Sequence, residues 1–144
     1  MISPSKFLSM LHLPRGWRKK LVLIGLAVFF IYVGVDHFVN PEFYLSIMPP
    51  AFPLHEEAVY VSGFFEVCGG VCVLIPRLRK IAGWGLVALL FAVYPANIYM
   101  AITPEAFPEI PIALLYLRLP FQFLFFYWAY SVTKPAYNSV YQKN

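Results

Sequence analysis

The sequence predicts an all-α protein that spans a membrane as a four-helix bundle, with its helices running up-down-up-down. Hydrophobic residues make up 60% of the chain and charged residues 12%, whereas soluble globular domains have roughly 45–50% and about 25%. A small soluble domain leaves much of its surface in water, so this much apolar surface indicates a lipid environment. The apolar residues also fall into four runs, each close to the roughly 20 residues that cross about 30 Å of hydrocarbon.

The four runs divide the chain into three segments. Residues 1–20 form a basic N-terminal segment, residues 21–132 the transmembrane domain, and residues 133–144 a tail. Strands of a closed barrel would be shorter and would alternate, so the runs are predicted to be helices. The predicted spans cover residues 21–39, 58–75, 81–101 and 112–132. A basic start before an apolar run also fits a signal peptide, but no small-residue cleavage pattern follows, and we predict an uncleaved helix.

Basic and acidic residues separate between the two sets of loops. Ten of the eleven Lys and Arg residues lie before the first run, between the second and third runs, or in the tail. Among them are Arg77, Arg79 and Lys80, which we interpret as topogenic charges. Residues 40–57 and 103–111 contain no basic residue and hold five of the seven acids. By the positive-inside rule, both termini are predicted to be cytoplasmic, and the predicted location is the bacterial cytoplasmic membrane.

The first outer loop is predicted to contain a short helix that lies in the membrane interface, over Pro41–Met48. Asn40 is a favourable N-cap, proline suits the first helical position, and Glu42 complements the helix dipole. Three prolines end this helix, at positions 49, 50 and 53. The second outer loop also contains prolines, so the two loops are predicted to form a fixed rim.

Six polar residues inside or at the ends of the predicted spans are the candidate ligand-binding residues. Ionisable side chains are costly within a membrane, so they mark functional sites by default. At about 1.5 Å of rise per residue, all of them lie in the outer half of the spans except the last, which lies near the midplane. The six residues are Asp36, His37, Glu66, Asn97, Arg118 and Gln122. No catalytic residue and no metal site are assigned.

Helical periodicity turns these polar residues toward the interior of the bundle. One face of the second span is a stripe of mostly small residues that also contains the carboxylate of Glu66. Its members are Ser62, Glu66, Gly69, Gly70 and Val73. Small residues in such a stripe allow helices to approach closely. One interpretation is that a buried Glu66–Arg118 ion pair locks the second span to the fourth. Asn97 and Gln122 would then satisfy backbone carbonyls near the prolines at positions 95 and 120.

The other interpretation is a pocket, in which the same polar groups orient a small and mostly apolar molecule. Four aromatic residues would supply its wall, at Tyr32, Tyr94, Tyr99 and Phe125. His37 alone is more typical of an interfacial or capping residue than of a ligand, and consecutive positions prevent Asp36 and His37 from forming a dyad. Cys68 and Cys72 are interpreted as packing thiols, with a redox pair or a soft-metal site as the alternative.

Several short motifs follow one another between Gly34 and Gln122. They are Asp36-His37-Phe38, Met48-Pro49-Pro50, Ser62-Gly63-x-x-Glu66-x-x-Gly69-Gly70, Arg79-x-x-Ala82-x-Trp84-Gly85, Pro95-Ala96-Asn97-Ile98-Tyr99-Met100-Ala101 and Arg118-Leu119-Pro120-x-Gln122. In this order and at these spacings, the sequence resembles the DoxX/DoxX-like family of small four-helix membrane proteins.

The resemblance implies a redox-associated accessory subunit that binds a quinone-like or other small molecule in the outer half of the bundle. The alternative is a non-enzymatic membrane assembly factor, and a small transporter is a third class. Expected partners are the lipid bilayer and a membrane or soluble redox protein, and a homo-oligomer is left open. A nucleic-acid partner is not expected, because the basic residues form no face beside a groove or stacking platform. No C-x-x-C redox motif is present, which argues against a self-sufficient thiol oxidoreductase. The sequence does not decide whether the protein is an enzyme of another kind.

Overall fold

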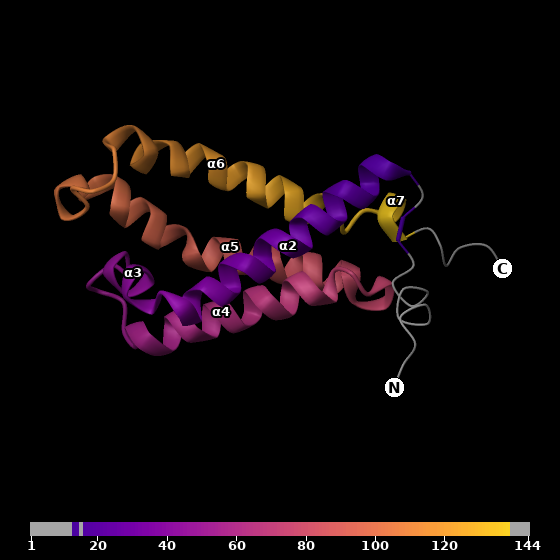
Figure 1. The fold of residues 1–144 in the computed structure, drawn as a ribbon, viewed down its shortest axis with the longest axis horizontal. Helices are drawn as coiled ribbons and strands as arrows, with labels where there is room; N and C mark the ends of the chain where they lie inside the picture. Colours follow the sequence, from indigo (N-terminus) through magenta and orange to yellow (C-terminus); the bar gives the residue numbers. More distant parts are fainter. Residues whose placement is uncertain (1–12, 15, 139–144) are drawn as a thin grey trace.

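The computed structural model describes residues 13–14 and 16–138, and all regular structure in these residues is helical. In chain order the elements are α2 (Trp17–Val39), α3 (Pro41–Ser46), α4 (His55–Cys72), α5 (Pro76–Ile102), η1 (Pro104–Ala106), α6 (Ile112–Ser131) and α7 (Pro135–Asn138) (Figure 1). Three of them, α2, α5 and α6, are long and apolar enough to cross a membrane. This confirms an all-α protein of the membrane type. Most of the predicted N-terminal segment and half of the tail lie outside the described residues.

The second predicted span, residues 58–75, corresponds to α4, which begins and ends slightly earlier. Its 18 residues include Glu56, Glu57 and Glu66, and α4 is not among the helices that are long and apolar enough to cross a membrane. Glu56 and Glu57 occupy the first turn, where negative charge is favoured by the helix dipole. The remainder of α4 therefore carries a single charged side chain, Glu66.

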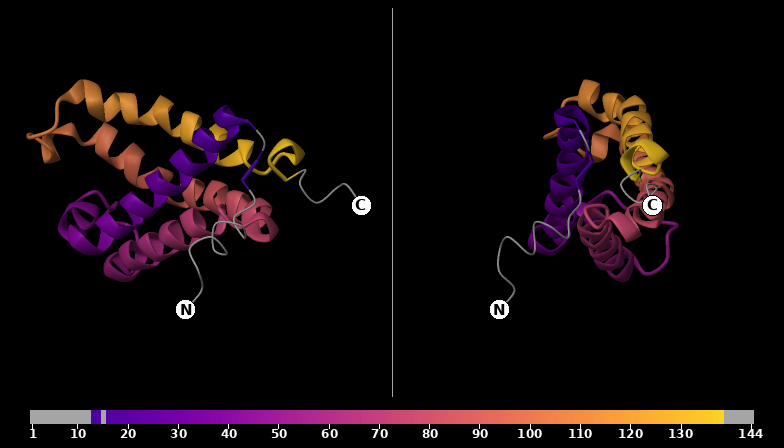
Figure 2. Two further views of the ribbon diagram at one scale, coloured as in Figure 1. Left: turned by 45° about the vertical axis from the view of Figure 1, so that its right-hand side comes forward. Right: turned by 90° about the vertical axis from the view of Figure 1, so that its right-hand side faces the viewer.

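The four long helices are arranged as two pairs, with α2 against α4 and α5 against α6. The pairs lie close together at the end occupied by α7 and separate toward the end occupied by α3 and η1 (Figure 1). A view turned by 45° shows the same divergence (Figure 2). We refer to these as the closed end and the open end of the molecule.

Two clusters of buried side chains hold the pairs together, one toward each end. The larger cluster lies toward the closed end and includes Leu26, Phe30, Leu86 and Val132. The smaller cluster lies at the open end and consists of Ile47, Met100, Phe107 and Leu115. In lipid, such contacts stabilise through close packing, because the surrounding solvent is itself apolar. The two pairs thus pack directly on each other toward the closed end. At the open end they are joined through Ile47, in the loop that follows α3.

Within the first pair, α2 and α4 are in direct backbone contact at two glycines. A Cβ atom on Gly63 would lie 2.6 Å from the Cβ of His37 and 2.8 Å from the carbonyl oxygen of Gly34. One on Gly70 would lie 2.9 Å from the carbonyl oxygen of Ala27. Gly69 instead abuts Leu86 of α5. The small-residue stripe therefore packs against two neighbouring helices, α2 and α5. Glycine is required at Gly63 and Gly70 because the backbone of α2 leaves no room for a side chain there.

Arg79, which was predicted to be a topogenic charge, also has a structural role, because it is fully buried in the first turns of α5. Its Nε donates to the carbonyl oxygen of Val73 at 2.7 Å, and its Nη2 to that of Leu74 at 3.1 Å. Both carbonyls lie just beyond α4, where a helix leaves acceptors without partners and its dipole favours a cation. Its Nη1 donates to the carbonyl oxygen of Tyr137 at 2.7 Å, which fastens α7 to the same point.

The loop helix α3 ends two residues earlier than the predicted Pro41–Met48. Asn40 occupies the predicted N-cap position, but its side chain makes no capping hydrogen bond. Its Nδ2 donates to Asp36 Oδ1 at 2.6 Å, one turn back on α2. Directly after α3, Ile47 is buried in the smaller cluster, so the loop is anchored across the open end.

Large hydrophobic side chains cover the outward faces of the long helices. Val28, Phe64, Phe91 and Phe123 are each more than half exposed. Contiguous apolar surface of this kind is rare on monomeric soluble proteins and marks a protein or membrane contact. Because it occurs on all four long helices, it fits contact with acyl chains.

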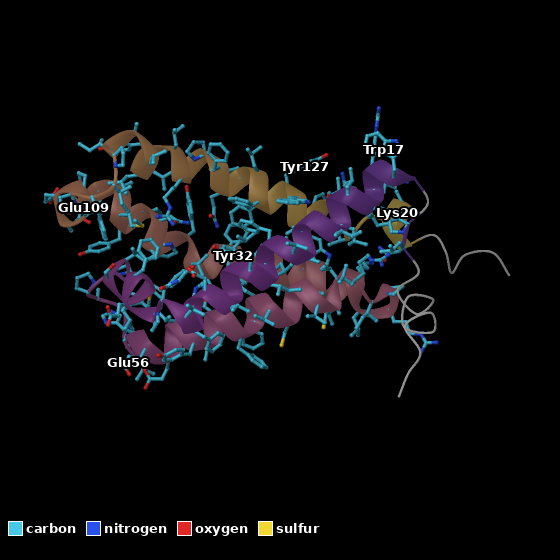
Figure 3. The ribbon with its side chains drawn as sticks, viewed as in Figure 1. Trp17, Lys20, Tyr32, Glu56, Glu109 and Tyr127 are labelled. Atoms are coloured by element: carbon cyan, nitrogen blue, oxygen red, sulfur yellow. The ribbon has the colours of Figure 1, made fainter. Side chains whose placement is uncertain are left out.

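Charged residues gather at the two ends of the long axis. Trp17 and Lys20 lie at the closed end, whereas Glu56 and Glu109 lie at the open end (Figure 3). The separation of basic and acidic residues in the sequence is therefore also a separation in space along the molecule.

Candidate functional site

A cavity of about 810 Å³ lies between the two helix pairs, and it extends to α3 and the loop that follows it. All four long helices contribute to its walls, which are mostly apolar. Five of the six candidate residues line it, namely His37, Glu66, Asn97, Arg118 and Gln122. The sixth, Asp36, does not line the cavity but contacts a residue that does.

On the wall formed by α2 and α4, the side chains of His37 and Glu66 are both buried and lie in contact. His37 Nδ1 is 3.3 Å from Glu66 Oε2 and 2.9 Å from the carbonyl oxygen of Val33. A carbonyl oxygen only accepts, so the hydrogen bond to Val33 requires a proton on Nδ1. Among the described residues, Glu66 Oε2 receives no hydrogen bond of good geometry, and the imidazole of His37 is its ionisable neighbour.

Tyr44 of α3 is a site residue that the sequence reasoning missed. Its ring stacks on the His37 imidazole with centroids 3.6 Å apart, and its hydroxyl donates to Asp36 Oδ2 at 2.8 Å. Asp36 and His37 therefore do not act as a dyad but are linked through Tyr44. The spacing of Asp36 and Tyr44 across a helix end is the sequence signal for this contact.

The neighbouring charges and the burial of Tyr44 determine the protonation state of its hydroxyl. Burial, followed by the hydrogen bond to Asp36, raises the pKa of Tyr44 above its ordinary range. The charge of Glu66 adds to this effect and that of Arg118 opposes it, so the hydroxyl lies within electrostatic reach of both. At neutral pH the phenol is therefore protonated and is a hydrogen-bond donor.

On the wall formed by α5 and α6, the two amides bind each other. Asn97 Nδ2 donates to Gln122 Oε1 at 3.1 Å, and Gln122 Nε2 donates to the carbonyl oxygen of Leu90 at 2.9 Å. The prediction had both amides bonded to carbonyls near Pro95 and Pro120. Gln122 does bind a carbonyl in the turns before Pro95, where a proline disturbs helical hydrogen bonding. Asn97 binds Gln122 instead, because the two side chains meet across the α5–α6 contact.

The predicted ion pair between Glu66 and Arg118 is absent from the described residues. Both residues line the cavity, but they project from different helix pairs, which separate at this level. Arg118 Nη1 donates to the sulfur of Met100 at 3.0 Å, which is a weak acceptor. The prediction was wrong because similar depth in the membrane does not fix the lateral distance between two helices.

The predicted aromatic wall is also largely wrong. Of the four residues proposed, Phe125 lines the cavity, where it stacks on Phe29 at 4.7 Å between centroids. Tyr32 is 70% exposed on α2 and is marked in Figure 3. Tyr94 packs edge-on against Phe123, and Tyr99 does so against Phe107. Sequence spacing gives the depth of a side chain but leaves its rotation about the helix uncertain by a fraction of a turn.

Cys68 and Cys72 are free thiols on α4, and both are half-buried. Cys72 packs against the larger buried cluster, in keeping with a packing role. Neither residue lines the cavity.

The cavity thus has two different polar walls separated by apolar space. The α2–α4 wall presents a carboxylate and an imidazole, and the α5–α6 wall presents a guanidinium and two amides. A few polar groups in a mostly apolar cavity are typical of sites that orient a small molecule.

A family model described as a domain of unknown function (DUF8561) matches residues 26–133. The match begins within α2, ends just after α6 and includes every candidate site residue. No model of the DoxX family matches, so the resemblance to that family was wrong. Its motifs consist largely of small, proline, aromatic and polar residues, which are also frequent in unrelated membrane helices. No curated protein and no solved structure matches the chain.

Proposed function

We propose a ligand-binding role for this chain, which belongs to the DUF8561 family. The proposed ligand is a small, mostly apolar molecule with a polar end, held between the two helix pairs. The observation that carries the proposal is the convergence of five polar side chains on one largely apolar cavity of about 810 Å³. Small-molecule sites are typically clefts of roughly 300–1,000 Å³ with a few placed polar groups.

The proposed topology is a bundle of four membrane-spanning helices in up-down-up-down order, with α4 as the second span. At about 1.5 Å per residue, the 18 residues of α4 extend nearly the thickness of the hydrocarbon core. Its interior charge, Glu66, faces the cavity rather than lipid. The basic closed end would lie on the cytoplasmic side, which places both termini in the cytoplasm of the bacterial cell predicted from the sequence.

Cysteine labelling tests this orientation. In a chain whose Cys68 and Cys72 are replaced by alanine, Glu56→Cys and Glu105→Cys should react with a membrane-impermeant maleimide in intact cells. Lys80→Cys and Lys134→Cys should react only after the membrane is permeabilised. Reaction of the two lysine positions in intact cells would reverse the proposed orientation, because they share the closed end.

Blocking the cavity tests the ligand-binding role. Ser62 lines the cavity from α4, so Ser62→Trp should fill it without leaving any charge unpaired. We expect dodecanol or dodecanoate to raise the melting temperature of the wild-type chain, because a ligand that binds only the folded state stabilises it. Ser62→Trp should fold but lose this increase.

Val71→Trp is the matched control for this experiment. Val71 lies on the exposed side of the same helix and does not line the cavity. It should keep the ligand-dependent increase in melting temperature. An equal increase in the wild type and in both variants would place binding elsewhere and contradict the proposal.

Other roles predicted from the sequence have weaker support. The quinone and the redox partner were implied only by the overturned resemblance to the DoxX family. An assembly factor would use the outer rim as a docking surface, but the rim turns Tyr44 and Ile47 inward, which favours a role in covering the cavity. A transporter of this size would need to oligomerise.

A further inference from the structure

Arg118 is a cation in the cavity wall whose charge no described carboxylate neutralises. The guanidinium has five N–H donors, and its hydrogen bond within the described residues goes to the uncharged sulfur of Met100. An arginine inside a membrane span is costly and normally pairs with an anion or with backbone carbonyls. Its half-buried position on the cavity wall leaves donors available to a bound molecule.

The acids Glu66 and Asp36, on α4 and α2, contact other groups. Glu66 lies against His37, with Oε2 and Nδ1 3.3 Å apart. Asp36 accepts hydrogen bonds from Asn40 at 2.6 Å and from Tyr44 at 2.8 Å. Each of these carboxylates thus has a neighbouring side chain on α2, on α3 or at the residue between them, and neither is paired with Arg118.

The polarity of the cavity changes steadily along α6. Arg118, Gln122 and Phe125 follow one another on the same face, about one helical turn apart, and all three line the cavity. Arg118 is nearest the open end, and Phe125, stacked on Phe29, lies toward the closed end. A bound molecule with one polar end would place that end at Arg118 and its apolar remainder against Phe29 and Phe125.

We infer that the ligand is a single-chain amphiphile with an anionic head, a carboxylate or a phosphate, bound by Arg118 with its chain in the apolar part of the cavity. This inference rests on the proposed function and names the class of ligand. A guanidinium forms strong, bidentate hydrogen bonds with both anions. The cavity volume suits one ligand of drug-like size, so one acyl chain is inferred rather than two.

The experiment compares amphiphiles that share a chain and differ in the head. The purified full-length protein in phosphatidylcholine nanodiscs would be titrated with dodecanoate, dodecyl phosphate and dodecanol, and dissociation constants measured by calorimetry. We expect at least one of the two anions to bind about tenfold or more tightly than dodecanol, because charge-assisted hydrogen bonds exceed neutral ones. The order of the two anions identifies the preferred head group.

Two variants assign the preference to Arg118. Arg118→Gln should bind the anions and dodecanol equally, whereas Arg118→Lys should keep most of the preference because it keeps the charge. Arg77→Gln removes the same charge from an exposed position outside the cavity and should behave as the wild type. Arg118 forms no described ion pair, so Arg118→Gln leaves no carboxylate without its partner. This variant is therefore expected to fold.

The outcomes separate the two proposals. Equal binding of all three amphiphiles by the wild type would overturn the anionic head while leaving the ligand-binding role in place. An anion preference that survives in Arg118→Gln would overturn the assignment to Arg118. Binding of none of the three would contradict both proposals.

Discussion

Replacing Arg79 by leucine is expected to lower the free energy of unfolding by about 3 kcal/mol or more. The change removes three hydrogen bonds, to the carbonyl oxygens of Val73, Leu74 and Tyr137. Each buried carbonyl left without a donor costs about 1–3 kcal/mol, and the end of α4 also loses the cation that its dipole favours. The measurement is the thermal unfolding midpoint of the purified protein in a maltoside detergent.

Arg77 and Lys80 provide controls that match the change in charge. Both flank Arg79 in sequence, and both are exposed. Arg77→Leu and Lys80→Leu remove the same topogenic charge but break no described hydrogen bond, so each should change stability by less than about 0.5 kcal/mol. If all three variants melted together, Arg79 would be acting through its charge alone and the structural role assigned to it would be wrong.

Replacing Gly63 by alanine is expected to destabilise the α2–α4 pair by roughly 1–3 kcal/mol, as for other overpacked sites. The added methyl group would lie 2.6 Å from the Cβ of His37 and 2.8 Å from the carbonyl oxygen of Gly34. Backbone atoms cannot rotate away, so the two helices must separate. Because His37 moves with α2, its contact with Glu66 should lengthen, and binding in the cavity should weaken together with stability.

Gly85→Ala is the control for the general effect of replacing a helical glycine. Gly85 lies on α5, and a Cβ atom there would meet nothing within 4 Å. Alanine is the better helix former by up to about 1 kcal/mol, so Gly85→Ala should be neutral or stabilising in the same melting experiment. A Gly63→Ala protein as stable as the Gly85→Ala protein would show that the helices do not meet at Gly63.

The helices were predictable because hydrophobic runs and prolines mark them directly. The predicted fourth span, residues 112–132, differs from α6 by one residue at its end, and proline begins α5 as it does α3. A hydrophobic run does not show how one pair of helices tilts relative to the other. The cavity depends on this tilt, because it lies where the two pairs diverge.

The candidate site was predictable in its members but not in its contacts. Five of the six polar residues line one cavity, because a costly polar side chain in a span is expected to face the interior. The contacts depend on rotation and lateral distance, and there the predictions failed. Glu66 lies beside His37 rather than Arg118, and Asn97 binds Gln122.

Arg79 illustrates a different obstacle, since its sequence context is identical to that of a loop charge. It stands between Arg77 and Lys80 at the boundary of two apolar runs, and the positive-inside rule accounts for all three equally well. Arg79 differs from the other two in its contact with α7, where it donates to the carbonyl oxygen of Tyr137. Tyr44 was missed in the same way, because a tyrosine in an amphipathic loop helix is ordinarily an interfacial residue.

The Arg79 cluster also imposes an order on the making of the protein. During synthesis, the carbonyls of Val73 and Leu74 leave the ribosome before Arg79 itself, so the first two hydrogen bonds can form as soon as α4 and the start of α5 are available. The third acceptor, Tyr137, lies 58 residues further along and cannot take part until α5 and α6 have been translated. Tyr137 therefore completes a corner whose other parts are already in place, which couples the formation of α7 to the junction between α4 and α5.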